Sequence, residues 1–145
     1  PMSGYPLVPG TPAGNITFIS HSGSVWEAVM HNNRGIHYNY VISAGNEMVT
    51  TLADHMLFAL SEPGTKVVGM FVETVRDPDD FCQALEIAAS NDIPVVALKV
   101  GRSKRGAQLA QVSVLAQRGF DLDPSIGVWL RERRMTSVKT LVEFA

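Results

Sequence analysis

Short apolar runs alternate with segments of helical periodicity along most of this chain. Four runs predict strands buried within a sheet: residues 16–19, 38–42, 67–72 and 94–100. Between them, apolar residues recur three or four positions apart, which is the spacing of one face of a helix. This alternation predicts an α/β fold, with a doubly wound parallel sheet in a three-layer α/β/α arrangement.

The predicted helices follow the strands in turn. The first three have apolar faces formed by Val25, Ala28 and Val29, by Leu52, Met56, Leu57 and Leu60, and by Phe81, Leu85 and Ala88. The third has the clearest start, because Asp77 is a good N-cap and Pro78 fits the first helical turn. Residues 124–133 and 137–141 predict a further helix and strand.

Proline and glycine are concentrated at the beginning of the chain, with four prolines and three glycines in the first fourteen residues. Such a composition opposes regular structure, so we expect a leader or an interdomain linker over residues 1–14. Residues 15–145 are then sufficient for one domain with a sizeable core.

Charge and cysteine content narrow the class of function. Twelve basic and fourteen acidic residues give a formal net charge of -2, so no nucleic acid is expected as a partner. No apolar run reaches membrane-spanning length, and no spacing of His, Cys and Asp predicts a metal site. Cys82 is the single cysteine, which excludes an internal disulfide and favours a cytoplasmic location.

Polar segments follow each predicted strand, at residues 20–24, 43–46, 73–76 and 99–103. In doubly wound sheets, ligands bind beyond the carboxyl ends of the strands. We therefore expect these segments to line one carboxyl edge of the sheet and to form the functional site.

The first of these segments has the composition of an anion site. Ser20, Ser22 and Ser24 offer hydroxyl groups, and Gly23 allows an anion to approach the backbone closely. A helix start adds open backbone N–H groups and the positive end of the helix dipole. Phosphate is the expected ligand; the alternative is a serine-capped helix start without a ligand.

Several motifs, in order, resemble one family. Residues 19–23, Ile-Ser-His-Ser-Gly, resemble the Ser-Gln/Arg-Ser-Gly turn that opens the second domain of succinyl-CoA synthetase alpha subunits and of NDP-forming (ADP-forming) acyl-CoA synthetases. Residues 43–47, 72–77 and 94–103 resemble the family's Ser-x-Gly-Asn loop, Glu-Gly-Ile-Arg-Asp turn and Lys-x-Gly-Arg-Ser segment. The resemblance covers residues 14–111 and implies a flavodoxin-like domain.

The resemblance also implies acid–thiol ligase chemistry. Family members interconvert acyl-CoA, phosphate and ADP (or GDP) with the free acid, CoA and ATP (or GTP), through an acyl phosphate and a phosphohistidine. By match, Ser20, Ser22 and Gly23 belong to the phosphate turn. CoA and ATP or ADP are expected only through partner domains, a CoA-binding Rossmann domain and an ATP-grasp domain, with no tightly bound cofactor in this chain.

The match assigns Glu73 a catalytic role, because it corresponds to the glutamate that hydrogen-bonds the ring of the phosphorylated histidine. Taken alone, Glu73 fits equally well as a strand-end carboxylate paired with Arg76 or Lys99. The family's phosphorylated histidine itself falls on Ser113 here. Serine cannot form the phosphoramidate that returns a phosphoryl group to ADP, so we expect the isolated chain to be inactive.

None of the four histidines is a clear substitute, and no histidine follows His55. His21 lies in the phosphate turn, where the family has Gln or Arg, so its side chain is expected to be variable and not catalytic. His31, His37 and His55 are expected at the surface, as solvated or capping residues.

Three hypotheses stay open at this point. The chain is a domain of an NDP-forming acyl-CoA synthetase, a non-catalytic binding or regulatory module that keeps the fold and the anion site, or a stand-alone flavodoxin-like domain with another small ligand. The acyl substrate, the nucleotide and homo-oligomer formation are left open.

Overall fold

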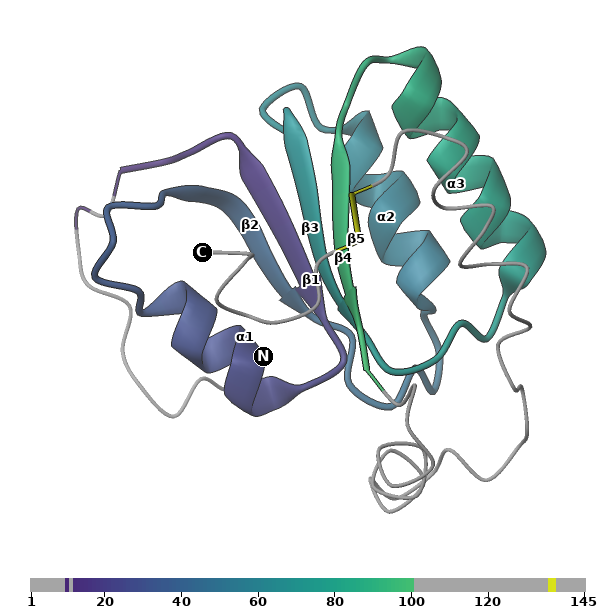
Figure 1. Cartoon of the computed structure of the whole chain (residues 1–145), viewed down its shortest axis with the longest axis horizontal. Coiled ribbons are helices and arrows are strands. Elements are labelled where there is room, and N and C mark those ends of the chain that lie inside the picture. Colours follow the sequence, from purple (N-terminus) through teal and green to yellow (C-terminus); the bar gives the residue numbers. More distant parts are fainter. Residues whose placement is uncertain (1–9, 11, 101–135, 138–145) are drawn as a thin grey trace.

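Every strand of the sheet runs parallel to its neighbours. The computed structural model describes residues 10, 12–100 and 136–137. Within them, the strand order is β2-β1-β3-β4-β5 (Figure 1). The strands are β1 (Ile16–Ser20), β2 (Tyr38–Ser43), β3 (Val67–Val72), β4 (Val95–Lys99) and β5 (Thr136–Ser137). This arrangement confirms the predicted parallel α/β sheet, with the first strand in its interior.

Three helices connect the first four strands. They are α1 (Gly23–Met30), α2 (Leu52–Ser61) and α3 (Pro78–Ser90). α1 lies on one face of the sheet, and α2 and α3 lie on the other (Figure 1). This division follows from the strand order. The chain passes from β1 to β2 on one side of β1, and then crosses to β3 on the opposite side of β1. Right-handed crossovers in opposite directions place their helices on opposite faces.

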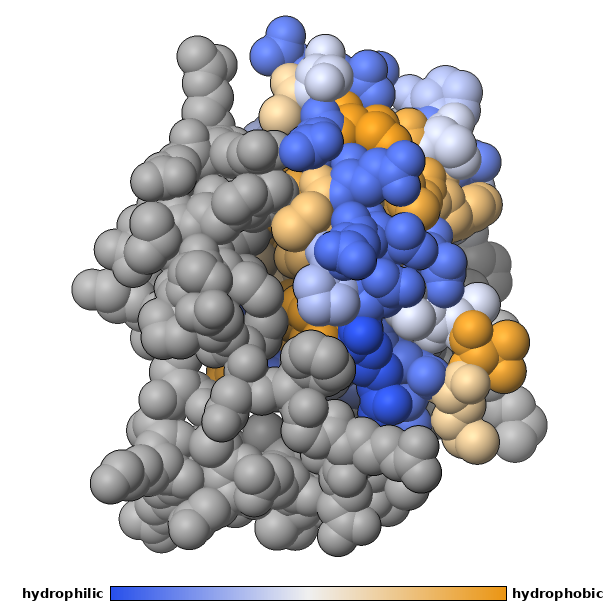
Figure 2. Space-filling view, turned by 90° about the vertical axis from the view of Figure 1, so that its right-hand side faces the viewer, coloured by the Kyte–Doolittle hydropathy of each residue, from blue (hydrophilic) through white to orange (hydrophobic). Residues whose placement is uncertain are grey.

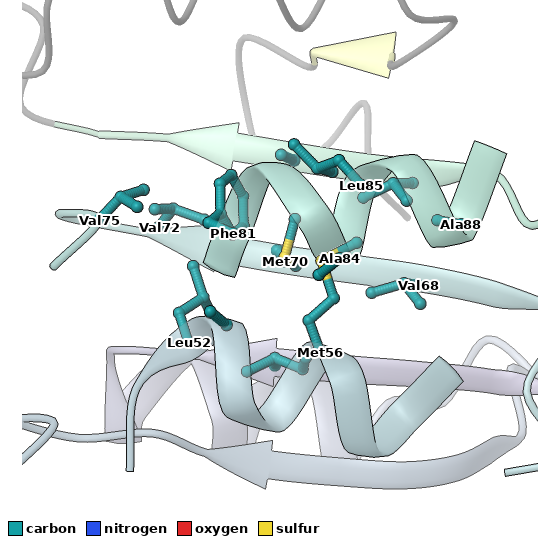
Figure 3. Close-up of a cluster of buried hydrophobic side chains, with 14 residues drawn as sticks. Leu52, Met56, Val68, Met70, Val72, Val75, Phe81, Ala84, Leu85 and Ala88 are labelled. Atoms are coloured by element: carbon teal, nitrogen blue, oxygen red, sulfur yellow. The ribbon is translucent and has the colours of Figure 1, made fainter. Parts of the chain in front are cut away.

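The larger part of the core lies between the sheet and the pair α2 and α3. Leu52 and Met56 of α2 and Phe81 of α3 point toward Met70 of β3 (Figure 3). All four side chains are buried. On the opposite face, a smaller buried cluster consists of Phe18, Phe71 and Leu98.

α1 packs less deeply than the sequence pattern predicted. Val25 and Val29 are partly buried against the smaller cluster, but Ala28 is exposed, so its expected place on the apolar face was wrong. Trp26 turns toward the sheet instead, and its Nε1–H donates a hydrogen bond of 2.8 Å to the carbonyl of Val41 in β2. The long indole side chain reaches β2, which an alanine side chain is too short to do.

Side-chain caps define where α2 and α3 begin. Thr51 and Asp54 form a capping box at the start of α2, in which each side chain pairs with the backbone of the other residue. Asp77 caps α3 as predicted, since its side chain accepts a hydrogen bond from the Asp80 N–H. Pro78 occupies the first turn of α3, which also agrees with the sequence prediction.

The described residues that are visible on the α3 side are mostly hydrophilic, with separate apolar areas between them (Figure 2). α3 explains this surface because its apolar positions face the core. The exposed positions of the helix are Asp79, Asp80, Gln83, Glu86, Ala89 and Ser90. An outer helix with this division of residues is what the predicted apolar face of Phe81, Leu85 and Ala88 implied.

The ends of the chain are only partly described. Residues 12–14 form no helix or strand, and Gly14 N–H donates a 3.1 Å hydrogen bond to the Tyr38 carbonyl. A Cβ atom at Gly14 would lie 1.8 Å from the carbonyl oxygen of His37, so only glycine fits this approach. The strand predicted over residues 137–141 overlaps β5 at Ser137. Ser113, residues 101–103 and the predicted helix 124–133 lie outside the described residues.

Candidate functional site

The predicted polar segments meet at the carboxyl edge of the sheet. Ser20, the last residue of β1, pairs in register with Ser43 of β2 and with Phe71 of β3. Val72 of β3 pairs with Lys99 of β4. The loops that follow these strands are therefore neighbours. Successive strands are added to one side of β1 and then to the other, so this reversal in strand order falls between β1 and β3. A reversal of this kind is where doubly wound folds bind ligands.

The turn after β1 is shaped by its own serines. The Ser20 hydroxyl is buried, donates to the Ser22 carbonyl at 2.8 Å and accepts from the Ser22 N–H at 3.1 Å. The Ser22 hydroxyl accepts a longer hydrogen bond, 3.4 Å, from the Val25 N–H and caps α1. Ser20 thus shapes the turn rather than facing outward, and the serine cap named as the alternative is present.

Two backbone donors of this turn stay open. Within the described part of the chain, no atom accepts a hydrogen bond from the N–H of Gly23 or Ser24. Both residues are exposed, and a Cβ atom added to Gly23 would meet nothing within 4 Å. The start of α1 therefore offers two N–H groups and free space to a compact anion, as a phosphate site requires.

A buried ionisable pair lies next to this turn. The His21 side chain is 3% exposed and the Glu47 side chain 1% exposed, and His21 Nε2 lies 3.3 Å from Glu47 Oε1. The same carboxylate oxygen accepts a hydrogen bond from the N–H of Leu52, the first residue of α2. Glu47 Oε2 lies 3.2 Å from Nε of Arg76, which follows β3.

The backbone of Glu73 is held from two sides. Its N–H donates a 3.0 Å hydrogen bond to Nδ1 of His21, and its carbonyl accepts a 2.7 Å hydrogen bond from Nζ of Lys99. Lys99 also donates to the carbonyl of Val100. Of the two partners named for a structural Glu73, Arg76 lies against Glu47, and Lys99 binds the Glu73 main chain.

Sequence reasoning missed the place of Glu47. It counted this residue only as part of the loop at residues 43–47, and it expected a variable His21. Both side chains are buried where three loops meet. The available signal was the presence of a histidine and a glutamate in two segments already expected to share one edge.

The other histidines have no part in the site. His31 and His37 are exposed, and His55 is partly exposed with its Nε2 3.2 Å from the Thr50 hydroxyl. Among the described residues, no group of three or more His, Cys, Asp or Glu side chains is arranged to hold a metal ion. None of the described helices has the length and apolarity needed to cross a membrane.

Sequence comparison gives one clear family. Residues 13–121 match the succinyl-CoA ligase-like flavodoxin domain. The 4-hydroxybutyrate–CoA ligase (ADP-forming) of Nitrosopumilus maritimus is 30% identical over 112 residues, which are 75% of this chain and 16% of the relative. The acetate–CoA ligase (ADP-forming) I of Archaeoglobus fulgidus is 30% identical over 99 residues, 67% of this chain and 14% of the relative.

Structure comparison finds the same fold in a larger enzyme. The apo dinucleotide-forming acetyl-coenzyme A synthetase 1 of Ca. Korarchaeum cryptofilum superimposes with a TM-score of 0.72 at 24% identity, covering 88% of this chain and 28% of that chain. The same enzyme in complex with phosphate and ADP gives a TM-score of 0.70. This chain therefore spans less than a third of the length of these relatives.

Proposed function

This chain belongs to the succinyl-CoA ligase-like flavodoxin domains, and we propose that it serves as the phosphate-binding domain of an ADP-forming acid–thiol ligase. The two sequence relatives described above are ADP-forming CoA ligases, of which the chain spans a small part. CoA and the nucleotide are then brought by other domains, a CoA-binding Rossmann domain and an ATP-grasp domain. One relative is itself the alpha subunit of a ligase, which supports a division among partners.

The open turn at the start of α1 is the observation that carries this proposal. The N–H groups of Gly23 and Ser24 are exposed at the reversal between β1 and β3. A phosphoryl group placed there would receive two backbone hydrogen bonds and the favourable end of the helix dipole. Such preformed donors also stabilise the charge of a phosphoryl group during transfer, since they need no rearrangement.

Glu73 is the proposed acidic residue of the site. It is half-buried, and its backbone is fixed on both sides by His21 and Lys99. In this proposal, the Glu73 carboxylate accepts a hydrogen bond from an imidazole ring that carries a phosphoryl group near the turn. That role follows the family resemblance and needs an imidazole, which position 113 does not provide in this chain.

Ser113 supports a second candidate function. A domain that holds phosphate but lacks the histidine has no nitrogen to carry the phosphoryl group from one site to another. The chain would then be a non-catalytic binding or regulatory module that keeps the anion site.

A phosphate titration followed by amide NMR tests the anion site. We expect inorganic phosphate to shift the Gly23 and Ser24 amide signals of the 145-residue chain. Gly23→Val should abolish the response because the added side chain fills the open space, while Ala28→Val, at an exposed position of the same helix, should retain it. Amide signals that do not respond in the unmodified chain would overturn the proposal.

A second part of the experiment separates the two functions. The chain is incubated with ATP, with and without ligase partner domains, and analysed by mass spectrometry that preserves phosphohistidine. We expect no phosphate on the chain alone or on Ser113→His alone. Acyl-CoA formation with partner domains supports the ligase function, whereas phosphate binding without any turnover supports the module. Phosphate on His21 would contradict both.

A further inference from the structure

Three loops of the carboxyl edge are joined by a cluster of residues around the buried His21–Glu47 pair, next to the anion site. His21 follows β1, Glu47 follows β2, and Glu73 and Arg76 follow β3. Each loop contributes to the cluster through a different kind of group: an imidazole ring, a carboxylate, and a backbone N–H with a guanidinium. The phosphate contacts proposed above come from the N–H groups of Gly23 and Ser24, which lie outside this cluster.

Glu47 is at the centre of this cluster. Its backbone adopts φ of +50°, a left-handed conformation that is uncommon for residues other than glycine. This conformation accompanies a buried carboxylate that reaches α2 through Leu52, the β1 loop through His21, and the β3 loop through Arg76. A backbone outlier held by several surrounding contacts is typical of functional sites.

The contacts of His21 select one tautomer. Nδ1 accepts a hydrogen bond from the Glu73 N–H, so this nitrogen carries a lone pair and no proton. The remaining nitrogen, Nε2, carries the proton in the neutral ring and faces the Glu47 carboxylate at 3.3 Å. That approach is a close electrostatic contact and not an aligned hydrogen bond. With both nitrogens turned inward, His21 is poorly placed to accept a phosphoryl group.

We propose that His21 and Glu47 are positioning residues, which hold the anion-binding turn and the backbone of Glu73 in a fixed relation. Glu47 fixes the ring through Nε2–H, and the ring holds the Glu73 N–H through Nδ1. This inference rests on the proposed function in assigning phosphate to the turn.

The proposal requires specific hydrogen-bonding groups at position 21. The side chain must present an acceptor toward Glu73 and a donor toward Glu47. A glutamine amide has one of each, so His21→Gln can satisfy both contacts. Leucine is similar in size and has neither, so His21→Leu removes both. His37→Leu applies the same substitution to an exposed histidine and is the matched control.

Amide exchange, imidazole NMR and phosphate titration of the full chain test this inference. Long-range proton–nitrogen spectra should show the Nε2–H tautomer for His21. Exchange at Glu73, relative to the buried Met70 amide of β3, should quicken about tenfold in His21→Leu, because one hydrogen bond is lost. His21→Gln and His37→Leu should stay within about twofold of the unmodified chain, and the phosphate dissociation constant should follow the same order.

Three results would overturn the inference: an Nδ1–H tautomer, unchanged relative exchange at Glu73 in folded His21→Leu, or His21→Gln behaving like His21→Leu. If His21→Leu does not fold, the tautomer and the His21→Gln exchange still decide. A chain that binds no phosphate would refute the proposed function. The His21 tautomer and the Glu73 exchange rate would still test the positioning role.

Discussion

Glu47 shows how a single residue can be misjudged from its sequence neighbours. It stands in a loop beside Met48 and Val49, whose side chains are 84% and 92% exposed, yet its own side chain is buried. Loop residues are usually solvated, so local pattern gives no reason to bury an acid there. Its burial depends on His21 and Arg76, which come from other loops and are brought close only by the complete sheet.

Glu47→Gln should lower the free energy of unfolding by about 2 kcal/mol, since it leaves buried groups poorly paired. The amide keeps the size of the carboxylate but turns a donor toward either His21 or Arg76. Urea denaturation measures the effect. Glu86→Gln, on the exposed face of α3, is the control and should change stability by no more than about 0.5 kcal/mol. Equal values for the two variants would mean that the buried carboxylate contributes nothing specific.

At the scale of elements, α2 and α3 begin with an aspartate at the same third helical position but in opposite electrostatic surroundings. Hydrogen bonds from the Thr51 backbone and hydroxyl lower the pKa of Asp54. The negative charge of Asp77 raises the pKa of Asp80. The ionised form of Asp54 is thus stabilised, whereas the ionised form of Asp80 is destabilised by the negative charge of the N-cap residue Asp77.

These two shifts predict opposite dependences of stability on pH. The lowered pKa of Asp54 means that its contribution is complete above the ordinary aspartate range and is lost as pH falls through the folded value. The raised pKa of Asp80 means that its ionised form is unfavourable at neutral pH, and that this penalty disappears as pH falls. Urea denaturation between acidic and neutral pH should therefore show Asp54→Asn destabilising the protein at pH 7, and Asp80→Asn not destabilising it. The same sign for both variants would contradict this explanation.

α1 shows the limit of periodicity for a short helix. Eight residues give only two turns, so a helical face is defined by two or three positions. The pattern correctly selected Val25 and Val29, but it included Ala28 and omitted Trp26. An indole can reach the sheet from a position beside the apolar face, and spacing alone does not include side-chain length.

At the scale of the whole molecule, the parallel sheet and the grouping of its loops at one edge were predicted from the sequence, while the contacts among the loops were not. Four buried apolar runs and their ordered motifs were enough to predict a parallel sheet with one functional edge. Alternation of this kind has few allowed topologies. The inward turn of the Ser20 hydroxyl and the buried His21–Glu47 pair depend on side-chain orientation across neighbouring loops, for which the sequence has no local signal.

The different burial of two side chains of α2 leads to one further prediction. Met56 is completely buried in the core (Figure 3). Phe58, on the same helix, is 44% exposed. Met56→Ala should lower the free energy of unfolding by about 3 kcal/mol because it leaves a cavity. Phe58→Ala should cost about 1 kcal/mol or less. Thermal or chemical unfolding measures both, and a larger loss from Phe58→Ala would place the main stabilising contacts elsewhere.

The hydrogen bond between Trp26 and Val41 occupies a backbone group at the edge of the sheet. β2 is the outermost strand on its side of the described sheet. The Ala44 N–H donates to Ser20 of β1, and backbone groups alternate in direction along a strand, so the Val41 carbonyl points away from β1. An incoming strand from a second molecule would need that carbonyl, and the indole already occupies it. Strand addition at this position of β2 would therefore have to compete with the Trp26 hydrogen bond, a consequence separate from the chemistry of the carboxyl edge.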